Sequence, residues 1–388
     1  MRIAYLDPHR VPDPATESLQ ILQTVDGLAQ AGANVYVITP QAQCSADSLL
    51  GRQVHERAQF FGLTDYSRRW WHISKSNRLF YRQALAWLRK NDADAILVRN
   101  LKLAERILKE GIKIPLIFET HEIFSQTYRE EHVVPTRKEQ KKLHSLEIRE
   151  AFVYQHASGI LTLTQALADD IQDVFKVDTP IHVAPDGVDL QLAAEALKTV
   201  RQPNHEPVML YLGSLHPWKG VETLIRAMPL VPVGRLWIAG GGELRIAELK
   251  HLATQLEVLQ RVDFLGPIDP LQRFELIAQA DICLLPLTQS SIASRYTSPL
   301  KLFEYMAMGK AIISADVPSI REVLTTRVDA LLCDPEDIEV FAELMSCLVL
   351  EPSLCEKLGN RASSVAKGYS WLARAEGIVK FISGLNAV

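Results

Sequence analysis

A lysine and a glutamate three residues apart are the side chains in this sequence best suited to hold a charged, hydroxyl-bearing ligand. Lys301 and Glu304 lie in Ser298–Asp316, which reads as a loop, a short helix that stops at Gly309, and a buried strand. Pro299 suits the first turn of that helix. A helix start attracts anions, so the added lysine favours a phosphate and the added carboxylate favours a sugar diol. The pair therefore outlines a nucleotide site, and an exposed ion pair is the alternative interpretation.

The same segment resembles the nucleotide-sugar signature of the retaining glycosyltransferases of family 4, in the form Pro-x-Lys-x-x-Glu-Tyr-Met-Ala-x-Gly. The resemblance implies the GT-B fold, with two Rossmann-like domains facing each other across a cleft. It also implies transfer of a hexosyl unit from a UDP- or GDP-linked sugar to a hydroxyl acceptor, with retention of configuration. Glu304 would hold the ribose hydroxyls, and no metal ion or other cofactor would be needed at the diphosphate. Tyr296 stands where the family often has the first glutamate of a Glu-x7-Glu pair, of which Glu304 would be the second.

Length and composition are those of a soluble protein with two domains. The 388 residues include 47% hydrophobic and 23% charged side chains, and the net charge of −4 argues against broad nucleic-acid binding. No apolar run approaches the roughly 18 residues of a membrane span, and the N-terminus lacks the pattern of a signal peptide. The five cysteines form no CxxC pair and no metal-binding spacing. We therefore expect a cytoplasmic protein without a metal site.

Strand-like and helix-like stretches alternate along the chain, which predicts the α/β class with doubly wound parallel sheets. The first series of predicted strands is Arg2–Leu6, Val35–Thr39, Ala95–Arg99, Leu116–Glu119, Ile160–Thr164 and Ile181–Ala184. The second series is Val208–Gly213, Leu236–Ala239, Val262–Leu265, Ile282–Leu285, Ala311–Ser314 and Ala330–Cys333. The restart predicts an acceptor-binding domain over 1–186 and a nucleotide-sugar domain over 187–368. The resemblance implies that a last helix, 369–388, crosses back to the first domain.

Glycine-rich turns follow the strands of the second domain, and the resemblance places the donor there. Lys219 in Gly213–Gly220 would put a point charge on a phosphate, whereas a solvated lysine is the alternative. Many relatives have arginine where this chain has Ser214. Gly241 would keep the next turn open, and Leu265 and Ile268 match the position that reads the base, although simple turns need the same residues. The predicted nucleotide-sugar residues are Gly213, Ser214, Lys219, Gly241, Leu265, Ile268, Ser298, Pro299, Leu300, Lys301 and Glu304.

Two histidines of the first domain are predicted site residues, His121 as a catalytic residue that bonds a donor-sugar hydroxyl or assists the developing charge, and His9 as an acceptor residue. His121 follows a strand of the first domain and matches a histidine that relatives place in the cleft, where either Glu119 or Glu122 would hold its ring. A structural histidine is the alternative. With Lys219 and Lys301, it completes the predicted catalytic set. His9 and Arg10, in the loop after the first strand, are predicted to recognise the acceptor or else to satisfy a stiff loop.

A basic and aromatic region, Arg68–Lys90, raises the question of membrane contact. Its apolar stripe, with Trp87 and Leu88, and a second basic stretch, Arg137–Lys142, suit peripheral binding to the inner face of a membrane, as in relatives that use lipid-linked acceptors. The alternative, slightly favoured, is a solvated helix whose stripe packs on the sheet.

Two rival functions are a nucleotide-sugar epimerase on the same fold and a non-catalytic nucleotide-sugar-binding scaffold. An epimerase needs several acids and bases in the cleft, and the Lys-x-x-Glu-Tyr-Met-Ala match does not resemble that class. A scaffold would bind the donor without turnover. The sequence predicts a role in polysaccharide, glycolipid or glycoconjugate synthesis, and leaves the base, the sugar, the acceptor and the oligomeric state open.

Overall fold

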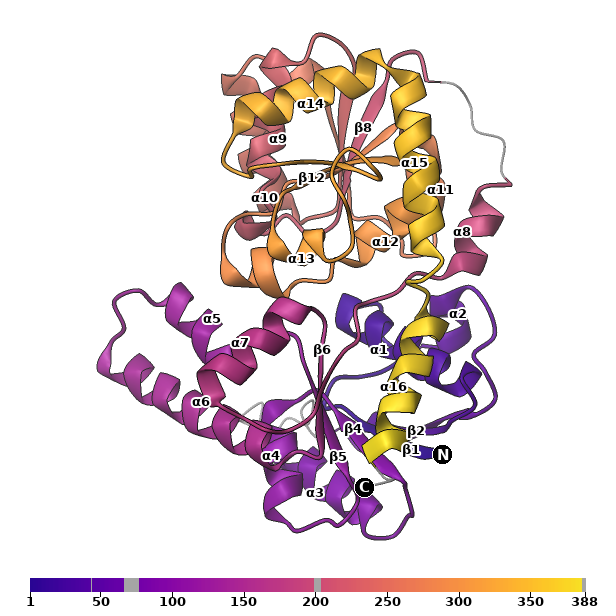
Figure 1. The fold of residues 1–388 in the computed structure, drawn as a ribbon, viewed down its shortest axis with the longest axis vertical. Coiled ribbons are helices and arrows are strands. Elements are labelled where there is room, and N and C mark those ends of the chain that lie inside the picture. Colours follow the sequence, from indigo (N-terminus) through magenta and orange to yellow (C-terminus); the bar gives the residue numbers. More distant parts are fainter. Residues whose placement is uncertain (43, 66–76, 199–203, 386–388) are drawn as a thin grey trace. The chain divides into compact units, whose positions relative to one another are not determined.

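The computed structural model describes residues 1–42, 44–65, 77–198 and 204–385, and these residues form two compact units (Figure 1). The first unit contains Met1–Pro185 together with the C-terminal segment from Trp371, and the second contains Asp186–Ser370. The predicted boundaries, after residues 186 and 368, lie close to these divisions. The functional labels given to the two domains stay predictions.

The first unit is built on a seven-stranded sheet in the order β3-β2-β1-β4-β5-β6-β7, and its strands all pair in parallel. Its apolar runs are buried on both faces, as expected for a parallel sheet covered by helices. The strands are β1 (Arg2–Leu6), β2 (Asn34–Pro40), β3 (Ala58–Leu63), β4 (Ala95–Val98), β5 (Leu116–Thr120), β6 (Gly159–Thr162) and β7 (Ile181–Val183).

Helices connect these strands, and one helix from the far end of the sequence joins them. They are α1 (Thr16–Gln30), α2 (Ala46–Leu50), α3 (Arg78–Leu88), α4 (Leu101–Lys109), α5 (Phe124–Glu131), α6 (Arg137–His156), α7 (Gln165–Phe175) and α16 (Trp371–Leu385). α16 packs against α1 so closely that a Cβ added at Gly27 would lie 2.7 Å from the carbonyl oxygen of Trp371. The C-terminal helix is therefore an integral part of the first unit.

The second unit has a six-stranded parallel sheet in the order β10-β9-β8-β11-β12-β13. Its strands are β8 (Val208–Leu212), β9 (Arg235–Ala239), β10 (Val262–Gly266), β11 (Ile282–Leu285), β12 (Ala311–Ala315) and β13 (Leu331–Cys333). Its helices are α8 (Leu190–Ala196), α9 (Val221–Ala227), α10 (Glu243–Gln255), α11 (Arg273–Gln279), α12 (Leu300–Ala307), α13 (Pro318–Arg321), α14 (Ile338–Leu350) and α15 (Pro352–Ala366).

Strand order reverses once in each sheet, between β1 and β4 and between β8 and β11. Ligands of doubly wound sheets bind beyond the carboxyl ends of the strands at such a reversal. The loops that follow β1, β4, β5 and β8 carry Asp7, His9, Arg99, His121 and Lys219. The topology therefore indicates one candidate ligand-binding place in each unit, beyond the carboxyl ends of the strands at the reversal.

Two local expectations need correction. The sequence did not predict β3, because Ala58–Leu63 is an edge strand whose side chains are mostly exposed and shows no buried run. Pro299 does not lie in the first turn of a helix. It is the N-cap of α12 in an extended conformation, and the helix begins at Leu300.

The predicted membrane-binding stripe packs inside its own unit where the structure describes it. Phe80, Ala84 and Leu88 are buried, and the ring of Trp87 lies 5.7 Å from that of Tyr36 and 5.5 Å from that of Phe61. This packing favours the alternative interpretation, a solvated helix on the sheet. Arg68 and the neighbouring basic and aromatic residues up to Lys75 lie outside the described residues.

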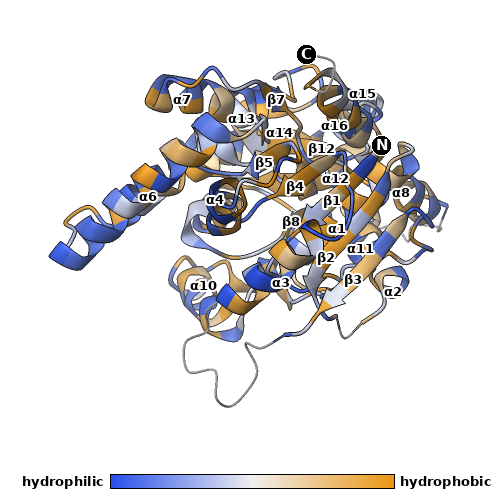
Figure 2. Cartoon of the chain, turned by 90° about the horizontal axis from the view of Figure 1, so that it is seen from below, coloured by the Kyte–Doolittle hydropathy of each residue, from blue (hydrophilic) through white to orange (hydrophobic). Residues whose placement is uncertain are grey.

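The second basic stretch, Arg137–Lys142, begins α6, whose first half is mostly exposed and hydrophilic (Figure 2). Thr136 caps this helix, with Glu139 completing a capping box. Within the described ranges, no helix is long and apolar enough to cross a membrane.

Candidate functional site

In the second unit, α12 brings Lys301 to the carboxyl end of β8. The backbone N–H of Leu212, the last residue of β8, donates a hydrogen bond of 2.9 Å to the hydroxyl of Tyr305 on α12. Lys301 Nζ lies 4.1 Å from the centre of the Tyr211 ring. It also lies against Gly213, where an added Cβ would collide with it. Gly213 has φ 143°, so its backbone and its surroundings both require glycine.

Lys301 carries a buried amino group whose charge is poorly compensated. Its Nζ atom has no hydrogen-bond partner among the described residues. Burial, and then the charge of Lys219, lower the pKa of Lys301 well below its usual value, and they outweigh the opposite effect of the Glu304 carboxylate. Lys219 Nζ lies 3.7 Å from the centre of the Trp218 ring, and burial lowers the pKa of Lys219 to about 7.

We call Gly213, Lys219 and Lys301 the lysine cluster. Two amino groups whose pKa values are both lowered by burial mark a place where positive charge is costly in the ligand-free protein. A ligand that brings negative charge would remove that cost.

Three glycines in the turns near the lysine cluster lie too close to neighbouring residues to carry a side chain. An added Cβ at Gly220 would collide with the carbonyl oxygen of Pro286, and one at Gly240 with that of Gly213. At Gly241, the Cβ would collide with the side chain of Leu215. All three glycines have positive φ. Glycine is therefore needed here to let the loops that follow β8 and β9 pack against each other and the turn at Gly220 pack against Pro286.

Glu304 lies one turn after Lys301 on α12 and is 8% exposed. The Nε atom of Arg273, at the start of α11, lies 2.5 Å from one of its carboxylate oxygens. Sequence reasoning missed Arg273, because nothing in the spacing of residues 273 and 304 indicates that they meet. The arginine fixes one edge of the carboxylate and leaves a second oxygen to accept hydrogen bonds.

The remaining predicted donor residues are placed less uniformly. Ser298 is buried, and its hydroxyl accepts a 2.9 Å hydrogen bond from the backbone N–H of Asp186. Leu300 begins α12 and is only partly buried, and Ser214 is exposed. Leu265 is exposed on β10, whereas Ile268 packs against the core. Of the predicted donor residues, Lys301 and Gly213 are in direct contact. The hydroxyl of Ser298 instead accepts a hydrogen bond from the backbone of its own unit.

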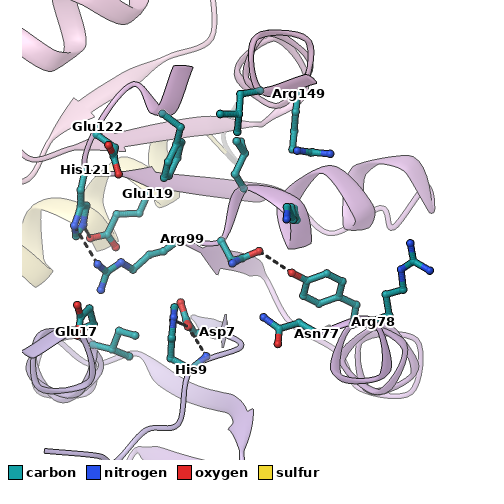
Figure 3. Close-up of a pocket in the computed structure, with 17 residues that line it drawn as sticks. Asp7, His9, Glu17, Asn77, Arg78, Arg99, Glu119, His121, Glu122 and Arg149 are labelled. Atoms are coloured by element: carbon teal, nitrogen blue, oxygen red, sulfur yellow. Dashed lines mark hydrogen bonds and ion pairs between the residues drawn. The ribbon is translucent and has the colours of Figure 1, made fainter. Parts of the chain in front are cut away.

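In the first unit, a cavity of about 790 Å³ lies beyond the carboxyl ends of β1, β4 and β5 (Figure 3). Both predicted histidines, His9 and His121, line it. Arg10 is not among its lining residues; it forms an ion pair with Asp65, and both side chains are largely buried. The structure therefore brings His9 and His121 to one cavity but does not bring Arg10 there.

The His121 ring is held at both nitrogens. Nε2 lies 2.8 Å from a carboxylate oxygen of Glu119, and Nδ1 lies 3.0 Å from the guanidinium of Arg99 (Figure 3). Because arginine only donates, Nδ1 must accept, and Nε2 must then carry the proton that it gives to Glu119. Burial, and then the charge of Arg99, lower the pKa of His121 to about 4. The ring is therefore neutral at physiological pH and fixed in one tautomer.

Glu119 is tied to the C-terminal helix. Arg374 of α16 places its guanidinium 2.8 Å from the same Glu119 oxygen, and it also donates to Thr24 and to the backbone carbonyl of Ala184. Both side chains of the ion pair are 2% exposed. Burial alone would raise the pKa of Glu119, but Arg374 and then His121 outweigh it and lower the pKa. α16 thus sets the carboxylate that orients His121, although 255 positions separate Glu119 from Arg374.

His9 is presented differently. One carboxylate oxygen of the buried Asp7 lies 2.7 Å from His9 Nδ1 and accepts a second hydrogen bond from the His9 backbone N–H. The hydrogen bond to Asp7 raises the pKa of His9. The imidazole is mostly exposed, so its other nitrogen is open to the cavity. His9 can therefore offer a proton or a hydrogen bond to a ligand, whereas both ring nitrogens of His121 are already occupied.

Sequence reasoning also missed Asp7 and Arg99. Each directly follows a predicted strand, or ends one, on the carboxyl side of the sheet, so the rule that placed His121 would have found them. Arg374 gave no such signal. Of the two flanking glutamates considered for His121, Glu119 holds the ring. In the described ranges, no group of three or more histidine, cysteine, aspartate or glutamate side chains is arranged to hold a metal ion.

Comparison with known sequences identifies relatives of both units. Residues 206–351 match the model described as Glycosyl transferases group 1, and residues 19–192 match that described as Glycosyltransferase Family 4. The D-inositol 3-phosphate glycosyltransferase of Nocardia farcinica is 26% identical over 256 residues, which cover 62% of this chain and 55% of the relative. That of Corynebacterium glutamicum is 25% identical over 289 residues, covering 69% and 66%. The chain thus matches little more than half of the Nocardia relative's length.

Solved structures show the same fold. A sucrose-phosphate synthase from Thermosynechococcus elongatus has a TM-score of 0.78 and 20% identity, covering 100% of this chain and 99% of its own. Anabaena Alr3699/HepE in complex with UDP-glucose has a TM-score of 0.73 and 19% identity, covering 99% and 100%. These likenesses confirm the predicted GT-B fold. One family model matches each part of the sequence, and together with the named relatives they show that this chain is a glycosyltransferase of the family 4 type.

Proposed function

We propose that this protein transfers a hexosyl unit from a nucleoside-diphosphate sugar to a hydroxyl of an acceptor. The observation that carries the proposal is Lys301 Nζ, which is buried beside a second lysine and has no hydrogen-bond partner in the described part of the chain. A buried cation is costly unless it is paired, so the site is stabilised by a ligand that brings negative charge. A diphosphate brings that charge, and the glycine turns after β8 and β9 let it approach the backbone.

The lysine cluster also suits the chemistry. As the bond between the sugar C1 and the diphosphate oxygen breaks, negative charge builds on the leaving group, and Lys219 and Lys301 are placed to stabilise it. The acceptor oxygen bonds to C1 on the same face, with retention, and its proton passes to the departing diphosphate. Because the diphosphate takes the acceptor's proton, the transfer needs no base from the protein. This agrees with the His121 ring, whose two nitrogens are both held by other side chains.

The comparisons support the class of substrate. Relatives are named D-inositol 3-phosphate glycosyltransferases, and structural neighbours were solved with UDP, with UDP-glucose and with UDP-2-fluoro glucose. We therefore favour a uridine donor over a guanosine donor, and a soluble or lipid-linked polyol as acceptor. The proposal needs no metal ion at the diphosphate, because two lysines supply the positive charge.

A panel of UDP- and GDP-linked hexoses tests the proposal by thermal shift and by release of nucleoside diphosphate. Binding to the native state alone raises the melting temperature, by an amount that grows with ligand concentration. We expect a uridine nucleotide to raise it and an added acceptor to accelerate nucleotide release. A shift without any turnover would identify a scaffold, and no shift with any nucleotide would refute the proposal.

Glu304→Gln sharpens the same test, with Glu356→Gln on the exposed face of α15 as control. Losing the charge-assisted bonds to the ribose diol should weaken donor binding roughly tenfold or more. Glutamine keeps an oxygen for Arg273, so the melting temperature of the ligand-free protein should fall only slightly. A large fall, or donor binding equal to that of the control, would show that Glu304 is structural.

A further inference from the structure

The two charged side chains that the proposed donor site needs on α12 are close enough on the helix to neutralise each other. Lys301 and Glu304 are three residues apart, and residues at this spacing are neighbours on a helix surface, with about 5–6 Å between their Cβ atoms. A lysine and a glutamate placed in this way can form an ion pair. Such a pair would occupy both the cation that the diphosphate needs and the carboxylate that the ribose needs.

In the structure these two side chains do not pair through a hydrogen bond. Lys301 Nζ has no hydrogen-bond partner among the described residues, although the atom is buried. Glu304 instead accepts a hydrogen bond of 2.5 Å from the Nε atom of Arg273. The side chains of this ion pair are only 12% and 11% exposed. The carboxylate is therefore held by an arginine of α11 and not by the lysine of its own helix.

Arg273 is itself anchored at two further points. Its Nη1 atom donates a hydrogen bond to the backbone carbonyl of Pro270, three residues earlier. The guanidinium carbon lies 4.6 Å from the centre of the Phe274 ring, which is buried in the core of the second unit. A guanidinium is a rigid fork, so these contacts fix the direction in which Nε points. Arg273 can therefore hold the Glu304 carboxylate in one place.

Competition between two cations for one carboxylate explains why the lysine is left unpaired. Arginine is more weakly hydrated than an ammonium group and presents its donors in a fixed geometry, so it is the better partner for a largely buried carboxylate. The charge of Glu304 does favour the protonated form of Lys301, but burial and the charge of Lys219 outweigh it and lower the pKa of Lys301. Without Arg273, the carboxylate would be free to turn toward Lys301.

We propose that Arg273 is a positioning residue that keeps Glu304 away from Lys301. The ammonium group is thereby left for the diphosphate, and one carboxylate oxygen is left for the ribose. The inference rests on the proposed donor site for the identity of these ligands, whereas the competition for Glu304 stands on the side-chain contacts alone. Arg273 contacts no reacting atom in this arrangement and acts on donor binding through the other two side chains.

A double-mutant cycle in the ligand-free protein tests the competition without any substrate. Arg273→Met should lower the melting temperature only slightly in the parent, because Lys301 can then pair with Glu304. The same change in a Lys301→Met background leaves Glu304 with neither cation and should lower the melting temperature much further. Arg235→Met is the matched control, since Arg235 pairs with Asp263 in the same unit, and its effect should not depend on Lys301.

The cycle has two outcomes that would overturn the proposal. One is that the effects of Arg273→Met and Lys301→Met on the melting temperature simply add. The other is that the Arg273→Met protein does not fold, because Lys301 would then be unable to replace Arg273 as the partner of Glu304.

Binding of inorganic pyrophosphate, measured by titration calorimetry, separates positioning from a purely structural role. Pyrophosphate has no ribose, so Glu304→Gln alone should change its affinity little. Arg273→Met should weaken its binding roughly tenfold or more, because the ligand must first break the new pair between Lys301 and Glu304. Adding Glu304→Gln to Arg273→Met removes the competing carboxylate and should restore most of the loss, while UDP should bind as weakly as it does to Glu304→Gln.

Pyrophosphate affinity that Arg273→Met leaves unchanged, or that the added Glu304→Gln fails to restore, would contradict the proposed role of Arg273. A parent protein that binds neither pyrophosphate nor UDP would instead refute the donor site. The double-mutant cycle would then still decide whether Arg273 separates Glu304 from Lys301, because it needs no ligand.

Discussion

The lysine cluster of the second unit and the His121 network of the first unit differ in whether their buried charged groups have partners within the protein. In the lysine cluster, two cations lie together, and burial lowers the pKa of both lysines. In the His121 network, Arg99, His121, Glu119 and Arg374 form an unbroken chain of hydrogen bonds that runs through one oxygen of Glu119, so the buried carboxylate is paired within the protein. The buried amino group of Lys301 has no hydrogen-bond partner among the described residues, whereas the buried carboxylate of Glu119 is held by an arginine and a histidine of its own unit.

This difference suits the lysine cluster to binding an anion and the His121 network to holding side chains in fixed positions. A buried positive charge without a partner destabilises the ligand-free protein and strengthens the attraction for an anion. A paired buried charge fixes geometry without attracting a ligand, and removing one partner destabilises the fold because the other charge is left uncompensated. Removing a charge from each region should therefore change stability in opposite directions, which gives the comparison a direct test.

The largest effect is expected for Arg374→Met. It leaves the buried carboxylate of Glu119 without its main partner, and breaking a buried ion pair costs about 3–5 kcal/mol. We expect a correspondingly lower free energy of unfolding, measured by urea titration. Because Glu119 would then orient His121 alone, the pKa of His121, measured by NMR, should also change.

Arg129→Gln is the matched control, since Arg129 pairs with Glu147 in the same unit but is exposed. Exposed pairs contribute about 0–1 kcal/mol, so this variant should stay near the unsubstituted protein. If Arg374→Met cost no more than Arg129→Gln, the His121 network would not be held by α16. The double variant Glu119→Gln/Arg374→Met should recover part of the loss.

Lys301→Met should change stability in the other direction. Methionine fills a similar volume without a buried charge, so the ligand-free protein should melt at a higher temperature, while the UDP thermal shift disappears. Lys357→Met, on the exposed face of α15, should change neither measurement. A Lys301→Met protein that is less stable than the parent would mean that the cluster is already neutralised without a ligand.

The smallest effect, and the most specific, is the pH dependence of the cluster. Lys219 has a pKa of about 7 when folded, against a usual value of 10.5, so between these values the unfolded chain binds more protons than the folded one. Stability of the ligand-free protein therefore rises with pH across this window. A bound diphosphate favours the charged lysine, so donor binding should take up a proton at pH 8 and weaken as pH rises above about 7.

Calorimetry of UDP binding at pH 8 in buffers of different ionisation enthalpy measures that proton uptake. Lys219→Gln should reduce it. Uptake that is zero in the parent protein, or unaltered in the variant, would contradict the assignment of the lowered pKa to an anion site.

Sequence patterns predicted the fold well where strands are buried. The predicted Val208–Gly213 and Ile282–Leu285 differ from β8 and β11 by one residue or none, because a short continuous apolar run is typical of a parallel strand buried on both faces. The edge strand β3 was missed since its exposed side chains carry no such signal. Pro299 was misplaced by one residue, because proline suits both the helix start and the extended residue before it.

The residues of the candidate site that stand in short sequence motifs were predictable from the sequence. Lys301, Gly213 and His121 stand in recognisable motifs next to strand ends, and the structure places the first two in contact. Arg273 and Arg374 could not be found this way, because each meets its glutamate only through the packing of elements that are far apart in the sequence. The partners that set the charge of a site are thus harder to predict than the groups that bear its chemistry.

The placement of α16 has a consequence for biosynthesis. The second unit is inserted between two pieces of the first, so a ribosome delivers the last helix of the first unit only after all of the second. Until Arg374 emerges, the nascent first unit holds Glu119 without its main partner, whereas the second unit already has every residue that it needs to fold. The unit that begins later on the ribosome can therefore be the first to reach its final structure.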